Sequence, residues 1–435
     1  MLRCIAFAVN LAVLGWLPAT RAETPAEWAV KHVENLVELY RQFHQMPELS
    51  SQEEKTAARV AELWKDAGVE VHDGVGGHGV VGLVKNGSGP TLMLRTDLDA
   101  LPVIENTGLV YASQVKVKNA DGTTTGVMHA CGHDIHITNL VGVAQFLASH
   151  KPDWSGTVML IGQPAEERGE GAQRMIDDGL FTKFPKPDMA LALHVDATLE
   201  TGKIGYRSGY TLANVDSVDV TMHGRGGHGA APHPTIDPIV QAAQLILSLQ
   251  TLVSREMNPV EPAVVTVGSI HGGTKHNVIP DSCRLQLTVR SYSDEVRQKL
   301  LEGIRRKANA VADGAGAPKP TVEVLDEFTP ALFNDAKLIE RLLPTFRKAL
   351  GESNVVPSEP SMGGEDFSRY GRAGVPIFMF RLGSVEPVRL AGLKRGGLEP
   401  PSLHSAIYYP DAEKTLVTGI TAMSAAVLEL LAPKK

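Results

Sequence analysis

Short apolar runs that alternate with helical patterns constrain the fold of this 435-residue chain most strongly. Four such runs lie at residues 80–84, 91–95, 157–162 and 189–194, and helical patterns such as residues 137–150 lie between several of them. A strand that is apolar along its whole length has to be buried on both faces. Strands of this kind, separated by helices, are typical of a largely parallel sheet with helices on both faces. We therefore predict an α/β fold.

A different rhythm begins near residue 212. Alternating strand patterns and two amphipathic helices follow one another in β-α-β-β-α-β order up to about residue 325. This order is typical of a split βαβ sandwich with an antiparallel sheet, and the α/β pattern resumes after it. The sequence therefore predicts an α+β domain, residues 212–325, inserted into a larger domain made of residues 23–211 and 326–435.

One helix start is also predicted from local spacing. Ser51 and Glu54 have the spacing of a capping box, in which each side chain binds the backbone amide of the other residue. The helix that follows should end at Gly68, because glycine readily adopts the conformation that terminates a helix.

Ionisable residues follow the predicted strands where the strands end. Asp97 and Asp99 follow one strand, and Glu166 and Glu167 follow the next. His194 ends another. Ligands of open α/β sheets bind outside the carboxyl ends of the strands, so these side chains should lie together. Taken alone, each aspartate could instead cap the N-terminus of a helix. The two glutamates could instead lie in the first turn of a solvent-exposed helix. Together they favour a metal site, with one glutamate as ligand and the other as base.

The segment HACGHDIH, residues 129–136, places Cys131 and His133 one residue apart, so both side chains can face one metal ion. Residues 1–22 have the charged start, short apolar run and small residues of a cleavable secretory signal, so we expect a periplasmic or secreted protein. In an oxidising compartment Cys131 and Cys283 have the alternative of forming a disulfide. Cys283 lies in an alternating segment, where a cysteine is usually a small core residue.

Composition excludes two classes of partner. Charged residues make up 21% of the chain and the net charge is −7, so no basic surface for nucleic acid is expected. After the N-terminal signal, no segment is long and apolar enough to cross a bilayer. The sequence predicts a globular protein that acts on a small molecule, with no nucleic-acid or membrane partner.

Eight motifs, in a fixed order, carry a resemblance to a known family. They are DLDALP, MHACGHD, GQPAEE, LALH, GGHGAAPH, HNVIPD, MGGEDF and PSLH, and they span nearly the whole chain after residue 22. Together they resemble the hippurate hydrolase and indole-acetyl-amino-acid hydrolase branch of the aminoacylase/carboxypeptidase-like metallopeptidases. The resemblance implies a two-metal exopeptidase-like catalytic domain. The inserted domain resembles the lid and dimerisation domain of this family, which implies a homodimer.

The resemblance also implies roles for individual residues. Glu166 is similar to the general base, and Asp99 to an aspartate that orients a metal ligand. His228 resembles a histidine that reaches the site of a partner subunit. Asn277 and Arg290 resemble residues that hold the substrate carboxylate. Two divalent metal ions are implied, for which zinc, manganese and cobalt are all suitable, and whether the cysteine bridges them stays open. The implied metal ligands are Cys131, His133, Glu167, His194 and His404.

The function that the resemblance implies is that of a metal-dependent amidohydrolase. Metal-activated water, with Glu166 as general base, would cleave N-acyl amino acids or short peptides that have a free C-terminal carboxylate. The alternatives are a dipeptidase or carboxypeptidase with peptide preference, a cysteine hydrolase that uses Cys131, and a periplasmic binding protein of the same fold. The carboxylate cluster argues against the cysteine hydrolase, and the presence of Glu166 as a base argues against the binding protein. Arg168 and the segments 112–126 and 384–401 depart from the family pattern, so the acyl group and the amino acid stay open.

Overall fold

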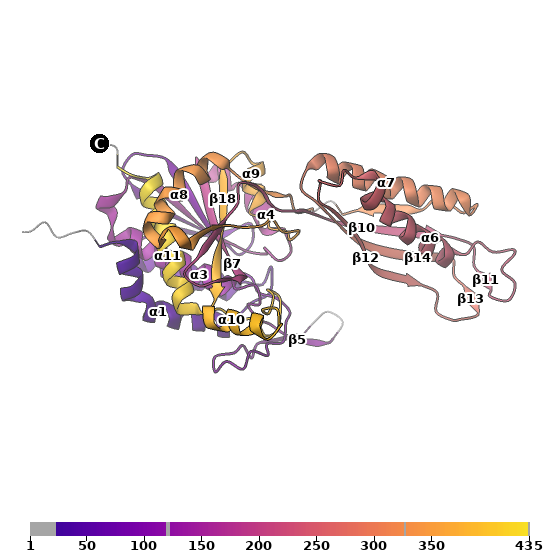
Figure 1. Ribbon diagram of the computed structural model, residues 1–435, viewed down its shortest axis with the longest axis horizontal. Helices are drawn as coiled ribbons and strands as arrows, with labels where there is room; N and C mark the ends of the chain where they lie inside the picture. Colours follow the sequence, from indigo (N-terminus) through magenta and orange to yellow (C-terminus); the bar gives the residue numbers. More distant parts are fainter. Residues whose placement is uncertain (1–22, 119–121, 326–327, 434–435) are drawn as a thin grey trace, which may run out of the picture.

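The computed structural model describes residues 23–118, 122–325 and 328–433, and the predicted signal at residues 1–22 lies outside them. The chain forms a larger α/β domain and a smaller α+β domain that projects from it (Figure 1). Over the described ranges, no helix is long and apolar enough to span a membrane.

The larger domain is built on an eight-stranded mixed sheet. Its central strands, β6, β3, β7 and β18, are parallel, and antiparallel pairs lie toward both edges. The predicted α/β fold with a largely parallel central sheet is therefore confirmed. In spatial order the strands are β1 (Glu70–Val75), β2 (Gly79–Asn86), β6 (Gly156–Gln163), β3 (Thr91–Asp97), β7 (Met189–Glu200), β18 (Ile377–Val385), β8 (Ile204–Tyr206) and β17 (Val355–Pro357).

Helices cover both faces of this sheet, as the apolar runs predict. Successive residues of β3 point to opposite faces: Leu92 and Leu94 join one hydrophobic core, and Met93 joins the other. The first core lies under α1 (Pro25–Gln45), α2 (Glu54–Asp66), α3 (His133–Ser149), α8 (Ala336–Leu350) and α11 (Ala412–Leu430). The second lies under α4 (Gly171–Asp177), α5 (Leu180–Lys183) and α9 (Ser368–Arg372).

The smaller domain has a four-stranded antiparallel sheet in the order β12-β14-β10-β15, with two helices packed on it. Alternate residues of its central strand β14, such as Leu285, Leu287 and Val289, form the core beneath these helices. Its elements follow the predicted β-α-β-β-α-β order. They are β10 (Asn214–His223), α6 (Pro238–Thr251), β12 (Ala263–Gly272), β14 (Ser282–Ser291), α7 (Asp294–Gly314) and β15 (Thr321–Val324).

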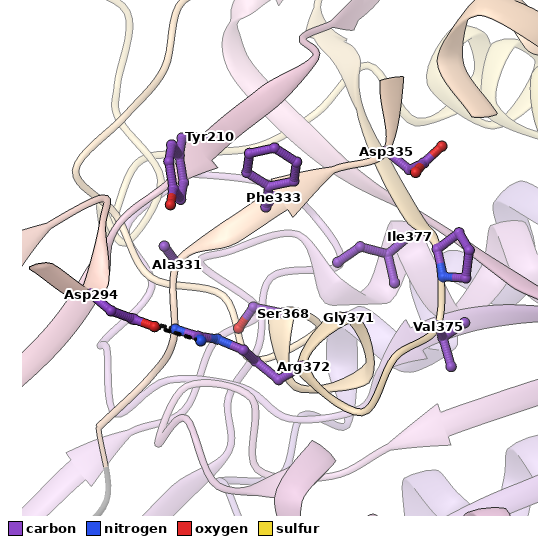
Figure 2. Close-up of a pocket in the computed structure, with 11 residues that line it drawn as sticks. Tyr210, Asp294, Ala331, Phe333, Asp335, Ser368, Gly371, Arg372, Val375 and Ile377 are labelled. Carbon is purple, nitrogen blue, oxygen red and sulfur yellow. Dashed lines mark hydrogen bonds and ion pairs between the residues drawn. The ribbon is translucent and has the colours of Figure 1, made fainter. Parts of the chain in front are cut away.

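A cavity of about 290 Å³ lies where the two domains meet. The rings of Tyr210 and Phe333 line one side of it, and an ion pair between Arg372 and Asp294 lines another (Figure 2). Arg372 ends α9 and Asp294 begins α7, so this pair links the two domains.

The remaining elements are β4 (Lys116–Lys118), β5 (Thr124–Gly126), β9 (Gly209–Leu212), β11 (Gly227–His228), β13 (Val278–Ile279), β16 (Leu332–Asn334), α10 (Pro387–Arg395), η1 (Lys151–Asp153), η2 (Leu252–Glu256) and η3 (Glu352–Asn354).

The predicted capping box is wrong. Helix α2 begins at Glu54, but its N-cap is Glu53, and Ser51 has a left-handed backbone with φ 66°. The start of the helix is capped instead by Glu48, whose carboxylate accepts hydrogen bonds from the amide and the hydroxyl of Thr56. The spacing of a local cap therefore coincides here with a turn that has other partners.

Candidate metal centre

Ionisable side chains converge where β3 and β6 end and α3 begins. The structure brings together all five residues proposed as metal ligands, in overlapping groups whose ligand atoms lie within 4.8 Å of one another. His194 lies within β7 and not at its end, because the strand continues to Glu200. The groups are Cys131–His133–His194, Cys131–Glu167–His404 and His133–Glu166–Glu167.

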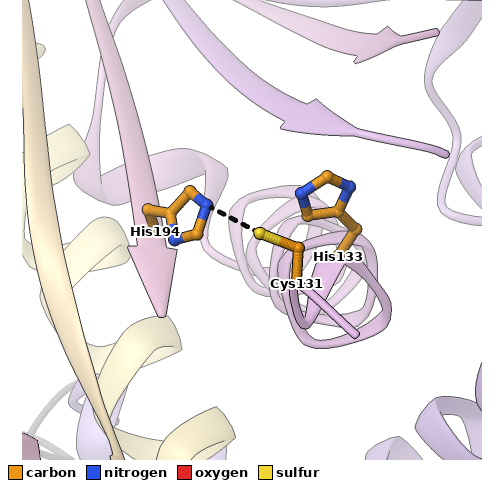
Figure 3. Close-up of side chains that lie close together, drawn as sticks. All are labelled: Cys131, His133 and His194. Carbon is orange, nitrogen blue, oxygen red and sulfur yellow. Dashed lines mark hydrogen bonds between the residues drawn. The ribbon is translucent and has the colours of Figure 1, made fainter. Parts of the chain in front are cut away.

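Cys131 and His133 come from the turn that opens α3, and His194 faces them from β7 (Figure 3). Gly132 between them has φ 78°, a conformation that glycine adopts without strain. The Cys131 Sγ atom lies 3.5 Å from Nε2 of His194. Nδ1 of His133 lies 2.8 Å from the carbonyl oxygen of Asp99, so Nδ1 carries the proton and donates it. The lone pair of His133 Nε2 therefore faces the cluster.

Three buried polar atoms of this cluster have no hydrogen-bond partner among the described residues: His133 Nε2, Glu167 Oε1 and Asp99 Oδ1. Buried polar atoms nearly always make hydrogen bonds, so three acceptors without a hydrogen bond in one place point to a further partner such as a cation. The surrounding imidazoles, thiol and carboxylate form a mixed nitrogen, sulfur and oxygen donor set. Such a set suits divalent transition metals. The residues therefore fit a metal centre.

Cys131 and Cys283, the two cysteines among the described residues, are both free. Cys283 is buried in the core of the smaller domain, so the disulfide alternative is not formed. Burial raises the pKa of the Cys131 thiol above its ordinary value, and Glu167 raises it further. A free nucleophilic thiolate is disfavoured in such a place, whereas a coordinating cation deprotonates a thiol.

Glu166 and Glu167 lie in the tight turn that follows β6. The Glu167 amide donates to Asp99 Oδ2 at 2.9 Å, and Glu167 Oε1 lies 3.4 Å from Nε2 of His404. The His404 side chain is 55% exposed and marks the open side of the cluster. Burial raises the pKa of Glu166 well above its ordinary value, and nearby carboxylates, first among them Glu365, raise it further. Glu166 is thus a buried carboxyl beside the proposed ligands.

A buried ion-pair network, not predicted from the sequence, lies behind the cluster. The Arg95 guanidinium donates to Asp97 at 2.7 Å, to Glu365 at 2.9 Å and to Asp366 at 3.1 Å. All four side chains are buried. Glu365 and Asp366 belong to the MGGEDF motif. The available signal was Arg95 itself, because a charged residue inside an apolar strand needs buried partners.

His136 also lies in this region, close enough to Asp97 and His133 for the three to hold a cation. Its Nε2, however, accepts a hydrogen bond from the Val195 amide at 3.0 Å. Nδ1 therefore carries the proton and donates it to Asp97 Oδ1 at 2.7 Å. Both ring nitrogens of His136 are in use, which excludes it as a ligand in this arrangement.

Two of the three residues proposed in the smaller domain, His228 and Asn277, do not join the cluster within one chain. β11, which contains His228, pairs with β13 at the far tip of this domain, and Asn277 accepts a hydrogen bond there from the Gly229 amide (Figure 1). Arg290 lies near the other end of β14, where it donates to the carbonyl oxygen of Met362 at 3.2 Å. Eight residues of extended strand, about 26 Å, separate the start of β14 from Arg290. One chain alone therefore does not form the expected Asn277–Arg290 clamp.

Comparisons with known proteins agree with this geometry. The family model described as Peptidase family M20/M25/M40 matches residues 93–395. Thermostable carboxypeptidase 1 of Saccharolobus solfataricus is 38% identical over 346 residues, which cover 78% of this chain and 84% of that protein. N-acetyl-L-cysteine deacetylase of Bacillus subtilis is 38% identical over 339 residues, 77% of each chain. The solved structure of the Bacillus subtilis YxeP protein, described as a dinuclear metal binding peptidase from the M20 family, matches with a TM-score of 0.74 and 29% identity. That match covers 92% of this chain and 99% of the YxeP chain.

Proposed function

The chain belongs to peptidase family M20/M25/M40, and on this premise we propose that it hydrolyses the amide bond of N-acyl amino acids or short peptides with a free C-terminal carboxylate. The chain is a metallo-amidohydrolase. The observation that carries the proposal is the cluster of proposed ligands, which contains buried acceptor atoms without a hydrogen bond. These ligands are Cys131, His133, Glu167, His194 and His404.

We propose that these residues hold two divalent metal ions. Cys131 belongs to two of the ligand groups, one with His133 and His194 and the other with Glu167 and His404, which supports a role of its sulfur toward both ions. When bound, the ions would activate water and stabilise the negative charge that develops on the amide oxygen. Zinc, manganese and cobalt all suit this donor set.

Glu166 is the proton-transfer group in this proposal. It lies next to the ligand Glu167, and its Oε2 is 4.0 Å from Nε2 of His133. A carboxyl group held in a buried site can accept a proton from water and later donate it to the leaving amine nitrogen. Asp99 supports this step because it fixes the Glu167 amide and orients His133.

The substrate carboxylate is assigned to Arg290 and Asn277, and a second contact to the reacting amide is assigned to His228. Since His228 and Asn277 lie at the tip of the smaller domain, far from the cluster of their own chain, the roles of these two residues require a homodimer. In that dimer the tip of one subunit would reach the cluster of the other. Two observations support this arrangement. His228 is exposed at the tip, and the cluster of the same chain lacks both His228 and Asn277.

Substrate choice within the family is also part of the proposal. The relatives include a carboxypeptidase and a deacetylase, so peptides and N-acyl amino acids are both candidates. The narrower resemblance to hippurate and indole-acetyl-amino-acid hydrolases favours an N-acyl amino acid. We also propose that the protein is exported to the periplasm or secreted, because of the signal-like residues 1–22.

The test is a panel of N-acyl amino acids and dipeptides, with release of free amino acid as the readout. Metal-loaded protein, with up to two divalent ions per chain, should turn over substrates that have a free carboxylate. Chelated protein should be inactive, and activity should return on adding metal. Full activity of metal-free protein, or no turnover of any panel member by loaded protein, would contradict the proposal.

A further inference from the structure

The turn between α1 and α2 reaches across the larger domain to the turn that carries Glu166 and Glu167. Glu53, at the end of this first turn, is completely buried. Its Oε1 accepts hydrogen bonds from the Ala165 amide at 2.8 Å and from the Ser51 amide at 2.7 Å. Since 112 residues separate Glu53 from Ala165, this contact is tertiary and has no role in capping a helix.

The backbone of Ala165 is unusual. Its φ of 51° lies in the left-handed region, which non-glycine residues rarely adopt. Over the described residues, the other non-glycine residues with positive φ are Ser51 and His404. Glu53 therefore binds the amides of two of these three residues. Conformations of this kind persist only where their surroundings hold them, and they occur often at active sites.

A second buried carboxylate holds the same turn one residue beyond Glu166. Oδ2 of Asp99 accepts hydrogen bonds from the Glu167 amide at 2.9 Å and from the Ser50 hydroxyl at 2.6 Å. Ser50 and Glu53 belong to the same turn. The backbone on both sides of Glu166 is therefore fixed from one segment, residues 50–53, directly at Ala165 and through Asp99 at Glu167.

We propose that Glu53 is a positioning residue for Glu166 and Glu167. By accepting a hydrogen bond from the Ala165 amide, Glu53 holds Ala165 in the left-handed conformation, and this conformation directs the two following carboxylates toward the cluster. For Glu166 the inference rests on the proposed function, whereas for Glu167 it concerns metal binding alone. The proposed role depends on the acceptor oxygen Oε1, which binds both amides. The other oxygen, Oε2, has no hydrogen-bond partner in the described part of the chain.

Three variants separate the acceptor from charge and from packing. Glu53→Ala removes the side chain, Glu53→Met fills the space without an acceptor, and Glu53→Gln keeps an acceptor oxygen without the charge. The matched control is Glu48→Ala, which removes a carboxylate of the same turn that caps α2 through Thr56. The control should lower the thermal midpoint and leave the readouts below unchanged.

The first readout is the affinity of metal-free protein for Co²⁺, measured by calorimetry and by visible absorption. Loss of a group that orients metal ligands typically costs about 10–100-fold in affinity, and we expect this loss in Glu53→Ala and Glu53→Met. Glu53→Gln should stay within about threefold of the wild type, since it retains the acceptor.

The second readout is kcat at saturating metal. We expect Glu53→Met to lose about 100-fold in kcat with KM changed less than about threefold, because a small misplacement of a reacting group is enough for such a loss. Glu53→Gln should restore most of kcat. If Glu53→Ala fails to fold, the comparison of Met with Gln still decides the question.

Wild-type Co²⁺ affinity and kcat in Glu53→Met would overturn the inference. An equal loss in Glu53→Gln and Glu53→Met would also overturn it, because the charge would then matter and the acceptor would not. A failure of the proposed function has a different signature. In that case the wild type shows no turnover, while the difference in Co²⁺ affinity between Met and Gln variants persists.

Discussion

Nδ1 of His44 lies 2.7 Å from Oδ2 of Asp134, and both side chains are buried where the end of α1 meets the first turn of α3. The other ring nitrogen of His44 lies 3.1 Å from Oε1 of Glu105. Burial lowers the pKa of His44, but the hydrogen bonds to the two carboxylates outweigh burial and raise the pKa to about 9. His44 is therefore a buried cation that ties the segment after β3 to α1 and α3.

This cation predicts a loss of stability at alkaline pH. An unfolded histidine has a pKa of about 6.5, so the folded state binds the His44 proton more tightly. The stabilisation, on the order of 3 kcal/mol, is fully present below about pH 6.5 and is lost as the pH rises through about 9. The urea concentration at the midpoint of unfolding should decrease as the pH is raised from about 7 to about 10. The decrease should be smaller in His44→Gln. Equal pH slopes for the two proteins would contradict the prediction.

The network behind the cluster predicts a large cost for losing Asp97. One oxygen of Asp97 binds Arg95 and the other binds His136. Breaking a buried ion pair by removing one charge typically costs about 3–5 kcal/mol, so we expect Asp97→Asn to lower the free energy of unfolding by about that amount. Asp219→Asn is the control, because Asp219 pairs with a largely exposed Arg284 and should cost less than about 1 kcal/mol. Urea unfolding measures both, and similar costs would show that burial of the pair is unimportant.

Glu166→Gln should separate catalysis from metal binding. The amide keeps the size of the side chain but cannot take a proton, and Glu166 is not among the proposed ligands. We expect metal content to stay at the wild-type level while turnover falls by roughly 10²–10⁴-fold. Glu170→Gln, in the same loop and paired with Arg174, should keep normal turnover. Near-normal turnover of a metal-loaded Glu166→Gln protein would exclude this residue as the base.

The strands and their site could be predicted from sequence because local pattern and general topology are sufficient for them. A run such as residues 91–95 can be buried on both faces only in a covered sheet. Parallel strands present their carboxyl ends at one edge, so residues as distant in sequence as Asp99 and Glu167 were expected to lie together. The contact between Glu167 and His404, which lies in a loop near the other end of the chain, followed only from the family resemblance.

Long-range partners could not be predicted in this way. Arg95 meets Glu365 across 270 residues, and nothing in the spacing of either motif identifies the other. The spacing of Ser51 and Glu54 fits a capping box, but a tertiary contact from Glu53 to Ala165 shapes that turn instead. A local pattern carries no information about a distant group that competes with it.

The geometry of the smaller domain predicts complementation between subunits. β11, with His228, lies at the tip far from the cluster of its own chain (Figure 1). If His228 acts on the partner subunit, a hybrid dimer of Glu166→Gln and His228→Ala chains contains one site with both groups intact. Mixing the two inactive proteins under conditions of subunit exchange should restore activity. Mass-tagged subunits would show whether exchange takes place. If exchange takes place and activity does not return, His228 does not act in trans.

Arg290 predicts how the substrate is recognised. Its guanidinium donates to the Thr288 hydroxyl at 2.9 Å and to the Met362 carbonyl at 3.2 Å, and no carboxylate of the described residues pairs with it. Burial lowers its pKa from the ordinary value, as expected for a half-buried cation without a counter-charge. A substrate carboxylate would supply that charge through two parallel hydrogen bonds.

Amidating the substrate carboxylate, or making Arg290→Ala, should therefore lower kcat/KM by similar factors, equivalent to about 2–5 kcal/mol. The two changes should not add, because each removes the same ion pair, so Arg290→Ala should treat acid and amide alike. Arg284→Ala, on the same strand but already paired with Asp219, should retain the preference for the acid. If the wild type hydrolyses the amide as fast as the acid, Arg290 does not bind the carboxylate and recognition has to depend on the acyl side of the bond.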